Sequence, residues 1–248
     1  ALARAQIRAQ RFGEADETLR EAAAEHPREW RVDWYRGLLD LARDRPQEAA
    51  EAFGRVYSRL PGGLAPRLAL ATACAAAGQY GRAAELFDVI SQIDPAVTSA
   101  AFGLARCVDE PEKKLRAYER VPASAYAYTT ARVRMIGVLV GGRSLPDLAA
   151  LKRAEQILAD PRLDLGDRRH AELRRDILAA ALRLVSPDPP EPPRPMPEQR
   201  VLGRPLVPRD LRFGLEETYR EIARLTRDRR ERIRLVDEAN RVRPRTLW

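Results

Sequence analysis

The sequence predicts an all-α protein, a right-handed solenoid in which pairs of antiparallel helices stack on one another. Three observations predict this class. Prolines recur 34 residues apart, at Pro27, Pro61 and Pro95. An alanine, followed four residues later by a large apolar residue, precedes each proline at a constant distance. The 248 residues are 45% apolar and 32% charged, a composition typical of folded rather than disordered chains.

The repeated positions extend through both halves of each unit. The alanines are Ala15, Ala49 and Ala83, the large apolar residues are Leu19, Phe53 and Phe87, and the same offset from Pro161 returns Ala149. In the first halves, small residues fall at Gly37, Ala71, Ala105 and Gly137. A unit of 34 residues that forms two helices is a tetratricopeptide repeat (TPR). We therefore expect about five TPR repeats, the first of them truncated at its start.

The residue types follow from the geometry of such a repeat. A small residue in each helix allows the two backbones to approach, and a larger side chain there would overpack at a cost of about 1–3 kcal/mol. Phe53 and Phe87 are expected to fill the space between successive repeats. The proline after the second helix has no amide hydrogen with which to continue the helix, so the chain turns there into the next unit.

The fourth unit is shorter than the others. FGLARCVDE predicts a first helix, but Pro111 follows at once and Val121-Pro122 ends a second helix of about two turns. Pro95 and Pro161 are 66 residues apart, close to two periods, so the short unit and the segment after it compensate.

The C-terminal part departs from the repeat. An amphipathic helix that begins at the candidate cap Asp167 is expected to cover the end of the stack, so that repeats and capping helix occupy 1–185. Residues 186–208 are rich in proline, which predicts an extended or polyproline II connection. Residues 209–248 are predicted to form a helical hairpin that packs on the solenoid end, with helices at about 211–225 and 227–241 and the candidate caps Asp210 and Thr226.

Residues suited to catalysis or metal binding are scarce. His26 and His170 have no cysteine or carboxylate at ligand spacing, and the glycine pairs lack the context of a phosphate-binding loop. Cys74 and Cys107 lie in apolar helical patterns, which favours buried thiols in a reducing compartment, the cytoplasm. We expect no catalytic residue, no metal and no cofactor in this chain.

Binding is the better-supported prediction. The first helices of stacked repeats line a concave side on which an extended or helical peptide can lie. The register places seven residues there: Trp34, Leu38, Leu68, Thr72, Phe102, Arg106 and Arg134. Such a mixture of aromatic residues and arginine is typical of binding hot spots. The other interpretation is that Trp34 and Phe102 only pack between neighbouring first helices.

The charge of the chain is concentrated at its end. The net charge is +8, and residues 200–248 hold 14 arginines and 8 acids, a net +6. A basic tail attracts polyanions. Acids and apolar residues are interspersed among the arginines, so a solvated face on a packed helix is favoured, an acidic protein surface comes next and nucleic acid is disfavoured. The sequence contains no apolar run long enough to span a membrane.

Several segments resemble one known family. The stretches WRVDWYRGLLDLARDRPQEAAEAF, LAPRLALATA, AAFGLAR, TTAR before GGRS, and above all LVDEANRVRP are similar to the C-terminal TPR region of actinobacterial protein kinase G. The similarity runs from about residue 30 to residue 244. The LVDEANRVRP segment lies outside any repeat and is the specific part of the resemblance.

The resemblance implies a role within a larger protein. In that family a rubredoxin-like module and a serine/threonine kinase domain, which uses ATP and Mg²⁺, precede the repeats in a cytosolic protein. Members phosphorylate a forkhead-associated domain protein that controls 2-oxoglutarate and glutamate metabolism. The chain is then expected to be a non-catalytic tail that stabilises the kinase domain, offers a homodimer surface and docks protein or peptide partners. No ATP-binding or catalytic residue can be carried over, because no positions of this chain match them.

A second hypothesis stays open at this point. The chain would be the TPR scaffold of another regulator, such as a transcription factor, whose basic tail contacts nucleic acid or an acidic partner. It predicts salt-sensitive affinity for duplex DNA that depends on Arg227, Arg229, Arg230 and Arg232.

Overall fold

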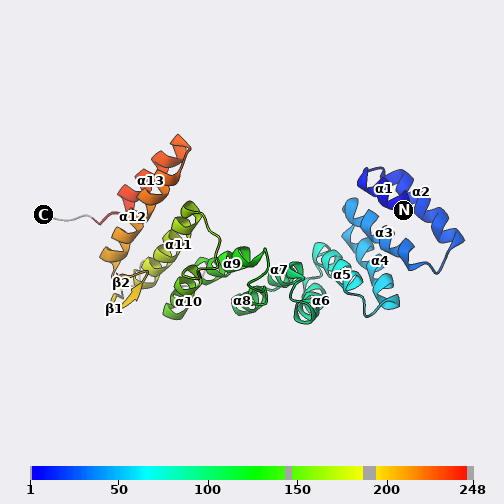
Figure 1. Cartoon of the computed structure of the whole chain (residues 1–248), viewed down its shortest axis with the longest axis horizontal. Helices are drawn as coiled ribbons and strands as arrows, with labels where there is room; N and C mark the ends of the chain where they lie inside the picture. The colour runs from blue at the N-terminus through cyan, green and yellow to red at the C-terminus, as the bar shows by residue number, and fades with distance from the viewer. Residues whose placement is uncertain (1, 143–146, 187–193, 245–248) are drawn as a thin grey trace. The chain divides into compact units, whose positions relative to one another are not determined.

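The computed structural model describes residues 2–142, 147–186 and 194–244. Within these residues the chain forms thirteen α-helices and one two-stranded sheet. Contacts divide it into two compact units, Ala1–Pro122 (unit 1) and Ala123–Trp248 (unit 2), and Figure 1 colours their elements in chain order. The predicted all-α class with TPR helix pairs is confirmed, and the small sheet is a local exception to it. The three predicted ranges 1–185, 186–208 and 209–248 stay predictions.

Unit 1 is a series of helices in which each one packs against the next along the chain, and α5 also packs against α7. The described helices are α1 (Leu2–Arg8), α2 (Phe12–Glu25), α3 (Trp30–Ala42), α4 (Pro46–Arg59), α5 (Leu64–Ala76), α6 (Tyr80–Ile93), α7 (Thr98–Cys107) and α8 (Pro111–Glu119). Pro27, Pro61 and Pro95 each begin a turn two residues past the end of a helix, and Pro161 begins one three residues past the helix that ends at Leu158. The shortened fourth pair is α7 and α8.

The 34-residue period also appears in the backbone geometry of unit 1. The turn between the helices of a pair contains a residue of left-handed conformation, with φ of 59° at Gln10, 56° at Asp44 and 75° at Gly78. At each turn the following amide donates to the carbonyl five residues earlier: Arg11 to Gln6 at 2.9 Å, Arg45 to Asp40 at 2.8 Å, and Gln79 to Cys74 at 2.9 Å. This is the Schellman motif, which satisfies carbonyls that the helix end leaves free.

The core of unit 1 lies between the paired helices. All six residues of the alanine and large apolar positions are buried: Ala15, Ala49, Ala83, Leu19, Phe53 and Phe87. A Cβ atom added at Gly37 would lie 2.7 Å from the Phe53 ring, which belongs to the second helix of the same pair. A Cβ atom added at Gly103 would lie 2.6 Å from the Phe87 ring, which belongs to the preceding pair. Phe53 therefore contacts the first helix of its own pair, and Phe87 contacts the first helix of the next pair.

Two positions of the predicted register have different surroundings. Ala71 and Ala105 are buried, but Gly137 is exposed, and a Cβ atom there would meet no atom within 4 Å. Ala149 is also exposed, since it lies in the first turn of its helix. That helix buries Leu151, Ala154 and Leu158 instead, which lie on a different face from the one that the register predicts.

In its described part, unit 2 is built of five helices and the two-stranded sheet. It contains α9 (Tyr128–Gly141), α10 (Leu148–Leu158), α11 (Asp167–Val185), β1 (Met196–Val201), β2 (Arg204–Leu206), α12 (Pro208–Leu225) and α13 (Arg229–Val242). Helix α11 packs against α9 and α10 on one side and against α12 on the other, and α13 packs against α12. The core includes Ile136, Leu151, Ile177, Leu178 and Leu211.

A β-hairpin replaces the extended connection predicted for the proline-rich segment. Strands β1 and β2 pair antiparallel, and the two residues between them, Leu202 and Gly203, have φ of 50° and 75°. Two consecutive residues of positive φ form the hairpin turn that fits the twist of paired strands. Val201 and Leu206 are completely buried in the core of unit 2, so the hairpin is held by packing as well as by strand pairing. The prolines at 187–193 lie outside the described residues.

The helix caps of unit 2 correct the sequence predictions. The side chain of Asp228 accepts a hydrogen bond from the Glu231 amide at 2.7 Å and caps α13. Thr226 is instead the C-cap of α12, and its hydroxyl donates to the Ile222 carbonyl at 2.7 Å. Asp210 lies inside the first turn of α12, and Asp167 is the first residue of α11 rather than its cap. The three predicted N-caps therefore lie near helix ends, but Thr226 follows a helix instead of preceding one, and Asp167 and Asp210 lie inside the first turn of their helices.

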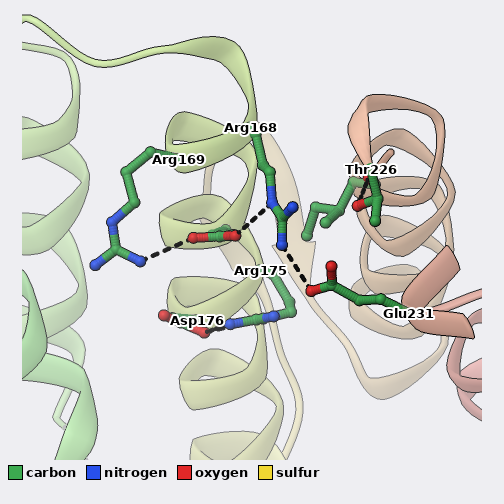
Figure 2. Close-up of polar contacts among 8 residues, drawn as sticks. Arg168, Arg169, Arg175, Asp176, Thr226 and Glu231 are labelled. Carbon is green, nitrogen blue, oxygen red and sulfur yellow. Dashed lines mark hydrogen bonds and ion pairs between the residues drawn. The ribbon is translucent and has the colours of Figure 1, made fainter. Parts of the chain in front are cut away.

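Ion pairs connect α11 to the last two helices. Arg168 on α11 donates to Glu172 at 3.0 Å and to Glu231 on α13 at 2.7 Å (Figure 2). Arg174 on α11 donates to Glu221 on α12 at 3.0 Å. Burial raises the pKa of Glu172, but the hydrogen bonds from Arg169 and Arg168 outweigh it and lower that pKa.

Candidate protein-interaction surface

Six of the seven predicted groove residues lie on three first helices of unit 1. Trp34 and Leu38 belong to α3, Leu68 and Thr72 to α5, and Phe102 and Arg106 to α7. Thr72 and Arg106 are exposed, and the other four are half-buried. Arg134 is exposed on α9, which belongs to unit 2. The groove itself stays a prediction.

The two aromatic residues of this set are partly used in packing. The Trp34 ring meets the Phe53 ring edge-on at a centroid distance of 5.4 Å, and Phe102 meets Tyr118 in the same way at 5.4 Å. In both cases the partner lies on the second helix of the same pair, not on a neighbouring first helix. Because each ring keeps part of its surface in water, both can also contact a ligand.

Thr72 has little to offer a ligand through its hydroxyl. The Thr72 hydroxyl donates to the Leu68 carbonyl within α5 at 2.8 Å. Its hydrogen is thus already used inside the helix, and the oxygen can only accept.

An apolar hollow of about 470 Å³ opens beside Trp34. Trp30 and Trp34, one turn apart on α3, form one wall, and the turn between α4 and α5 forms the other with Pro61, Gly62 and Gly63. Two residues four apart lie on the same face of a helix, so both indoles reach the hollow. Glycines in the turn leave the space that side chains would fill. We call this feature the tryptophan hollow.

Sequence reasoning identified Trp34 but missed Trp30 and the glycine turn. Two signals were available in the sequence: the spacing of four residues between the two tryptophans, and the Pro61-Gly62-Gly63 turn after the second helix of the same pair. The hollow itself could not be read from the sequence, because it depends on how close the α4–α5 turn lies to α3.

The rim of the tryptophan hollow is basic. Arg59 lines it and pairs with Asp33 of α3 at 3.3 Å, and Arg55 on the same helix pairs with Asp33 at 2.8 Å. Arg31 lies over the Trp30 ring at 5.3 Å from its centroid and pairs with Glu29 at 3.1 Å. Arg55 and Arg59 share the single carboxylate of Asp33, which leaves one positive charge beside the apolar walls.

The two cysteines are free thiols, and no metal-binding group is found among the described residues. Burial raises the pKa of Cys74 and of Cys107, which lowers the fraction of reactive thiolate. Among the described residues, no three His, Cys, Asp or Glu side chains are grouped so that they could hold a metal ion. Nor does this part of the chain contain a helix with the length and apolar character that crossing a membrane requires.

Residues 1–246 match the family model described as the protein kinase G tetratricopeptide repeat. The serine/threonine-protein kinase PknG of Mycobacterium leprae is 30% identical over 219 residues, which are 87% of this chain and 28% of that protein. PknG of Mycolicibacterium smegmatis is 28% identical over 237 residues, 94% of this chain and 30% of that protein. The chain therefore spans under a third of the length of these relatives.

A solved structure supports the fold. The C-terminal part of a TPR repeat-containing protein from Cytophaga hutchinsonii aligns over 97% of this chain and 92% of its own with a TM-score of 0.57. Its sequence is only 10% identical, so it shows the architecture and not the role. Because the family model spans almost every residue, including the hairpin and the tail helices outside the repeats, the chain belongs to the protein kinase G tetratricopeptide repeat family.

Proposed function

We propose that this chain is the non-catalytic interaction module of a serine/threonine protein kinase. It docks a protein partner through the tryptophan hollow, supports the kinase domain of its parent and contributes a homodimer surface. The parent is a cytoplasmic kinase that uses ATP and Mg²⁺ in a domain outside this chain. No step of phosphoryl transfer is assigned to the residues described here.

The tryptophan hollow is the observation that carries the docking role. Two half-exposed indoles beside an apolar space of about 470 Å³ form the kind of pocket that anchors a single large side chain of a partner. The arginines at its rim favour a partner segment that carries carboxylates next to that anchor. The pair of free cysteine thiols supports a reducing compartment.

The metabolic part of the proposal rests on the resemblance of the repeats and of the LVDEANRVRP tail to protein kinase G. It assigns the parent a role in signalling that controls glutamate and 2-oxoglutarate metabolism, through a forkhead-associated domain substrate. The coding sequence upstream of residue 1 tests the parent's identity. HRD and DFG elements of a kinase are expected there, and a different neighbouring domain would remove the assignment.

The docking role is tested with Trp30→Ala in the full-length parent. Trp30 lines the hollow without a ring contact to Phe53, so this change removes one wall with little effect on the core. For the forkhead-associated protein substrate we expect KM to rise about fivefold or more, as for a truncated hot-spot residue. For a short peptide that carries the same phosphorylation site, kcat and KM should stay unchanged.

Tyr80→Ala is the matched control, because Tyr80 is an exposed aromatic residue of unit 1 outside the hollow. It should leave both substrates unaffected. An unchanged KM for the protein substrate in Trp30→Ala would rule out docking at this hollow. An equal loss with both substrates would instead assign the module to support of the kinase domain alone.

A further inference from the structure

The tail of unit 2 contains an uncompensated basic segment. Residues 224–234 hold six arginines and two acids. The arginines, all of them exposed, are Arg224, Arg227, Arg229, Arg230, Arg232 and Arg234. None of the six guanidinium groups forms a hydrogen bond or an ion pair with a residue that the structure describes, although the Arg232 backbone amide donates within α13. An arginine surface of this kind is unusual in a protein whose other arginines are mostly paired.

Both acids of the segment are already engaged elsewhere. Asp228 caps α13 through the Glu231 amide, and Glu231 pairs with Arg168 of α11 at 2.7 Å (Figure 2). Four other carboxylates of the tail pair with other arginines: Glu216 with Arg220 and Arg243, Glu217 with Arg204, Glu221 with Arg174, and Glu238 with Arg241. The positive charge of residues 224–234 is therefore available to a partner.

An apolar hollow lies beside these arginines. It measures about 410 Å³, lies between α12 and α13, and has Ala223 and Val236 in its walls. Arg224 and Arg232 stand at its rim. Nearby, Ile233 is 51% exposed and Leu225 is 39% exposed. Among the described residues of α13 only Ala239 is fully buried, and Leu235 and Val236 are half-buried.

We infer that the α12–α13 hairpin is a docking site for an acidic amphipathic peptide segment of a partner protein. An aliphatic side chain of that segment enters the hollow against Ala223 and Val236, and flanking carboxylates pair with Arg224 and Arg232. Arginine suits this role because its planar fork binds a carboxylate through two parallel hydrogen bonds. The site belongs to unit 2 and does not depend on the tryptophan hollow.

The surroundings favour a peptide over nucleic acid. The apolar residues that line the hollow, Ala223 and Val236, are aliphatic and no aromatic ring is among the lining residues, whereas single-stranded nucleic acid is bound by aromatic rings on which bases stack. The carboxylates of Glu217, in the lining, and Asp237, exposed on α13, would repel a continuous run of phosphates. A peptide with separated acids can avoid both.

The test measures binding of a fluorescein-labelled peptide, four repeats of Glu-Glu-Leu-Leu, to the 248-residue chain by fluorescence anisotropy at low salt. The wild-type chain should bind it. The double variant Arg224→Gln/Arg232→Gln should bind about fivefold more weakly or worse, since two exposed ion pairs are lost. Val236→Thr, which keeps the shape but adds a hydroxyl to the wall, should also weaken binding.

Two controls separate this site from general attraction between charges. Arg4→Gln/Arg8→Gln removes two exposed arginines of α1 and should bind like wild type. A peptide of Glu-Glu-Gln-Gln repeats, which has the charge without the apolar side chains, should bind more weakly than the leucine peptide. The inference is overturned if the wild-type chain does not bind the leucine peptide, if Arg4→Gln/Arg8→Gln weakens binding as much as Arg224→Gln/Arg232→Gln, or if the glutamine peptide binds as tightly as the leucine peptide. It is also overturned if a DNA duplex binds more tightly with the same dependence on Arg224 and Arg232.

Discussion

Arg168 on α11 donates a hydrogen bond of 2.7 Å to Glu231 on α13, which lies 63 residues later in the chain. The same guanidinium also donates to Glu172 on its own helix, and both carboxylates favour its charged form, so the pKa of Arg168 is raised. One side chain thus joins the helix next to the repeats to the last helix of the tail. Because Glu231 pairs with Arg168, its carboxylate does not neutralise the arginines of the tail.

This bridge should be visible as coupling between the two residues. Arg168→Gln and Glu231→Gln should each lower the free energy of unfolding, and the double variant should lose less than the sum of the two. The reason is that each single change removes the same ion pair. Urea denaturation of the four proteins gives the coupling, and a strictly additive result would mean that the bridge contributes nothing in solution. Arg11→Gln/Glu14→Gln, a pair within one exposed helix of unit 1, is the comparison cycle.

The cap of α13 provides a second prediction. Asp228→Ala should lower the stability of the chain by about 1 kcal/mol, because the Glu231 amide loses its acceptor. Asp210→Ala should cost only a few tenths of a kcal/mol, since Asp210 interacts with the helix dipole in the first turn of α12 without capping it. Thermal unfolding measures both. If the two variants were equally destabilised, the assignment of the cap to Asp228 would be wrong.

Replacing two glycines of first helices by alanine should change the stability of the fold in opposite directions. Gly37→Ala places a Cβ atom 2.7 Å from the Phe53 ring and should destabilise unit 1 by about 1–3 kcal/mol. Gly137→Ala meets no atom within 4 Å and should stabilise its helix by about 0.5–1 kcal/mol. Adding Phe53→Leu to Gly37→Ala should recover part of the loss, because the smaller side chain leaves room for the methyl group. A stabilising effect of Gly37→Ala, measured by urea denaturation, would contradict the close approach.

The left-handed turn residues provide a fourth test. Gly78→Ala should destabilise the chain by about 1 kcal/mol, because a Cβ atom disfavours a φ of 75°. Gln10→Gly, at the equivalent turn with φ of 59°, should do the reverse and stabilise by about 0.5–1 kcal/mol. Differential scanning calorimetry of both variants checks the signs. Two changes in the same direction would show that the turns are not equivalent in solution.

Asp160 predicts a pH dependence of stability. Hydrogen bonds from Arg162, from the Tyr128 hydroxyl at 2.5 Å and from the Arg162 amide hold its pKa well below the ordinary value of 3.8. Because the folded state lowers this pKa, the carboxylate stabilises the fold fully above pH 3.8 and loses this effect as the pH falls below it. Asp160→Asn should therefore be less stable than wild type at neutral pH and approach it in acid. A constant difference between the two proteins from pH 7 to pH 2 would contradict this.

Much of unit 1 followed from local sequence signals. The alanine and large apolar positions of unit 1 repeat with its helix pairs and are buried, and Pro27, Pro61 and Pro95 each follow the end of a second helix. Gly78 is expected at a helix end for the same local reason, since only glycine adopts positive φ without strain. Six of the predicted groove residues lie on first helices of unit 1 and Arg134 lies on α9 of unit 2, and the groove itself stays a prediction.

The positions that the sequence misplaced depend on neighbours distant in the chain. Gly137 and Ala149 share the spacing of the repeat, but their helices pack against α11 rather than against another regular pair, so a different face is buried. The cap at Asp228 was missed because α13 begins two residues later than its charge pattern suggests. Trp30 lines a hollow only because the turn at Gly62 and Gly63 lies opposite it.

By itself, the sequence determined the helix pairs, their period and the turn residues, because these rest on contacts between residues fewer than 34 apart. Only the tertiary structure decided that the proline-rich segment ends in a buried β-hairpin, that Arg168 reaches Glu231, and that two apolar hollows open beside unpaired or shared arginines. The physical reason is that burial and charge pairing depend on which surfaces meet, and residues far apart in the chain meet only once the helices have packed.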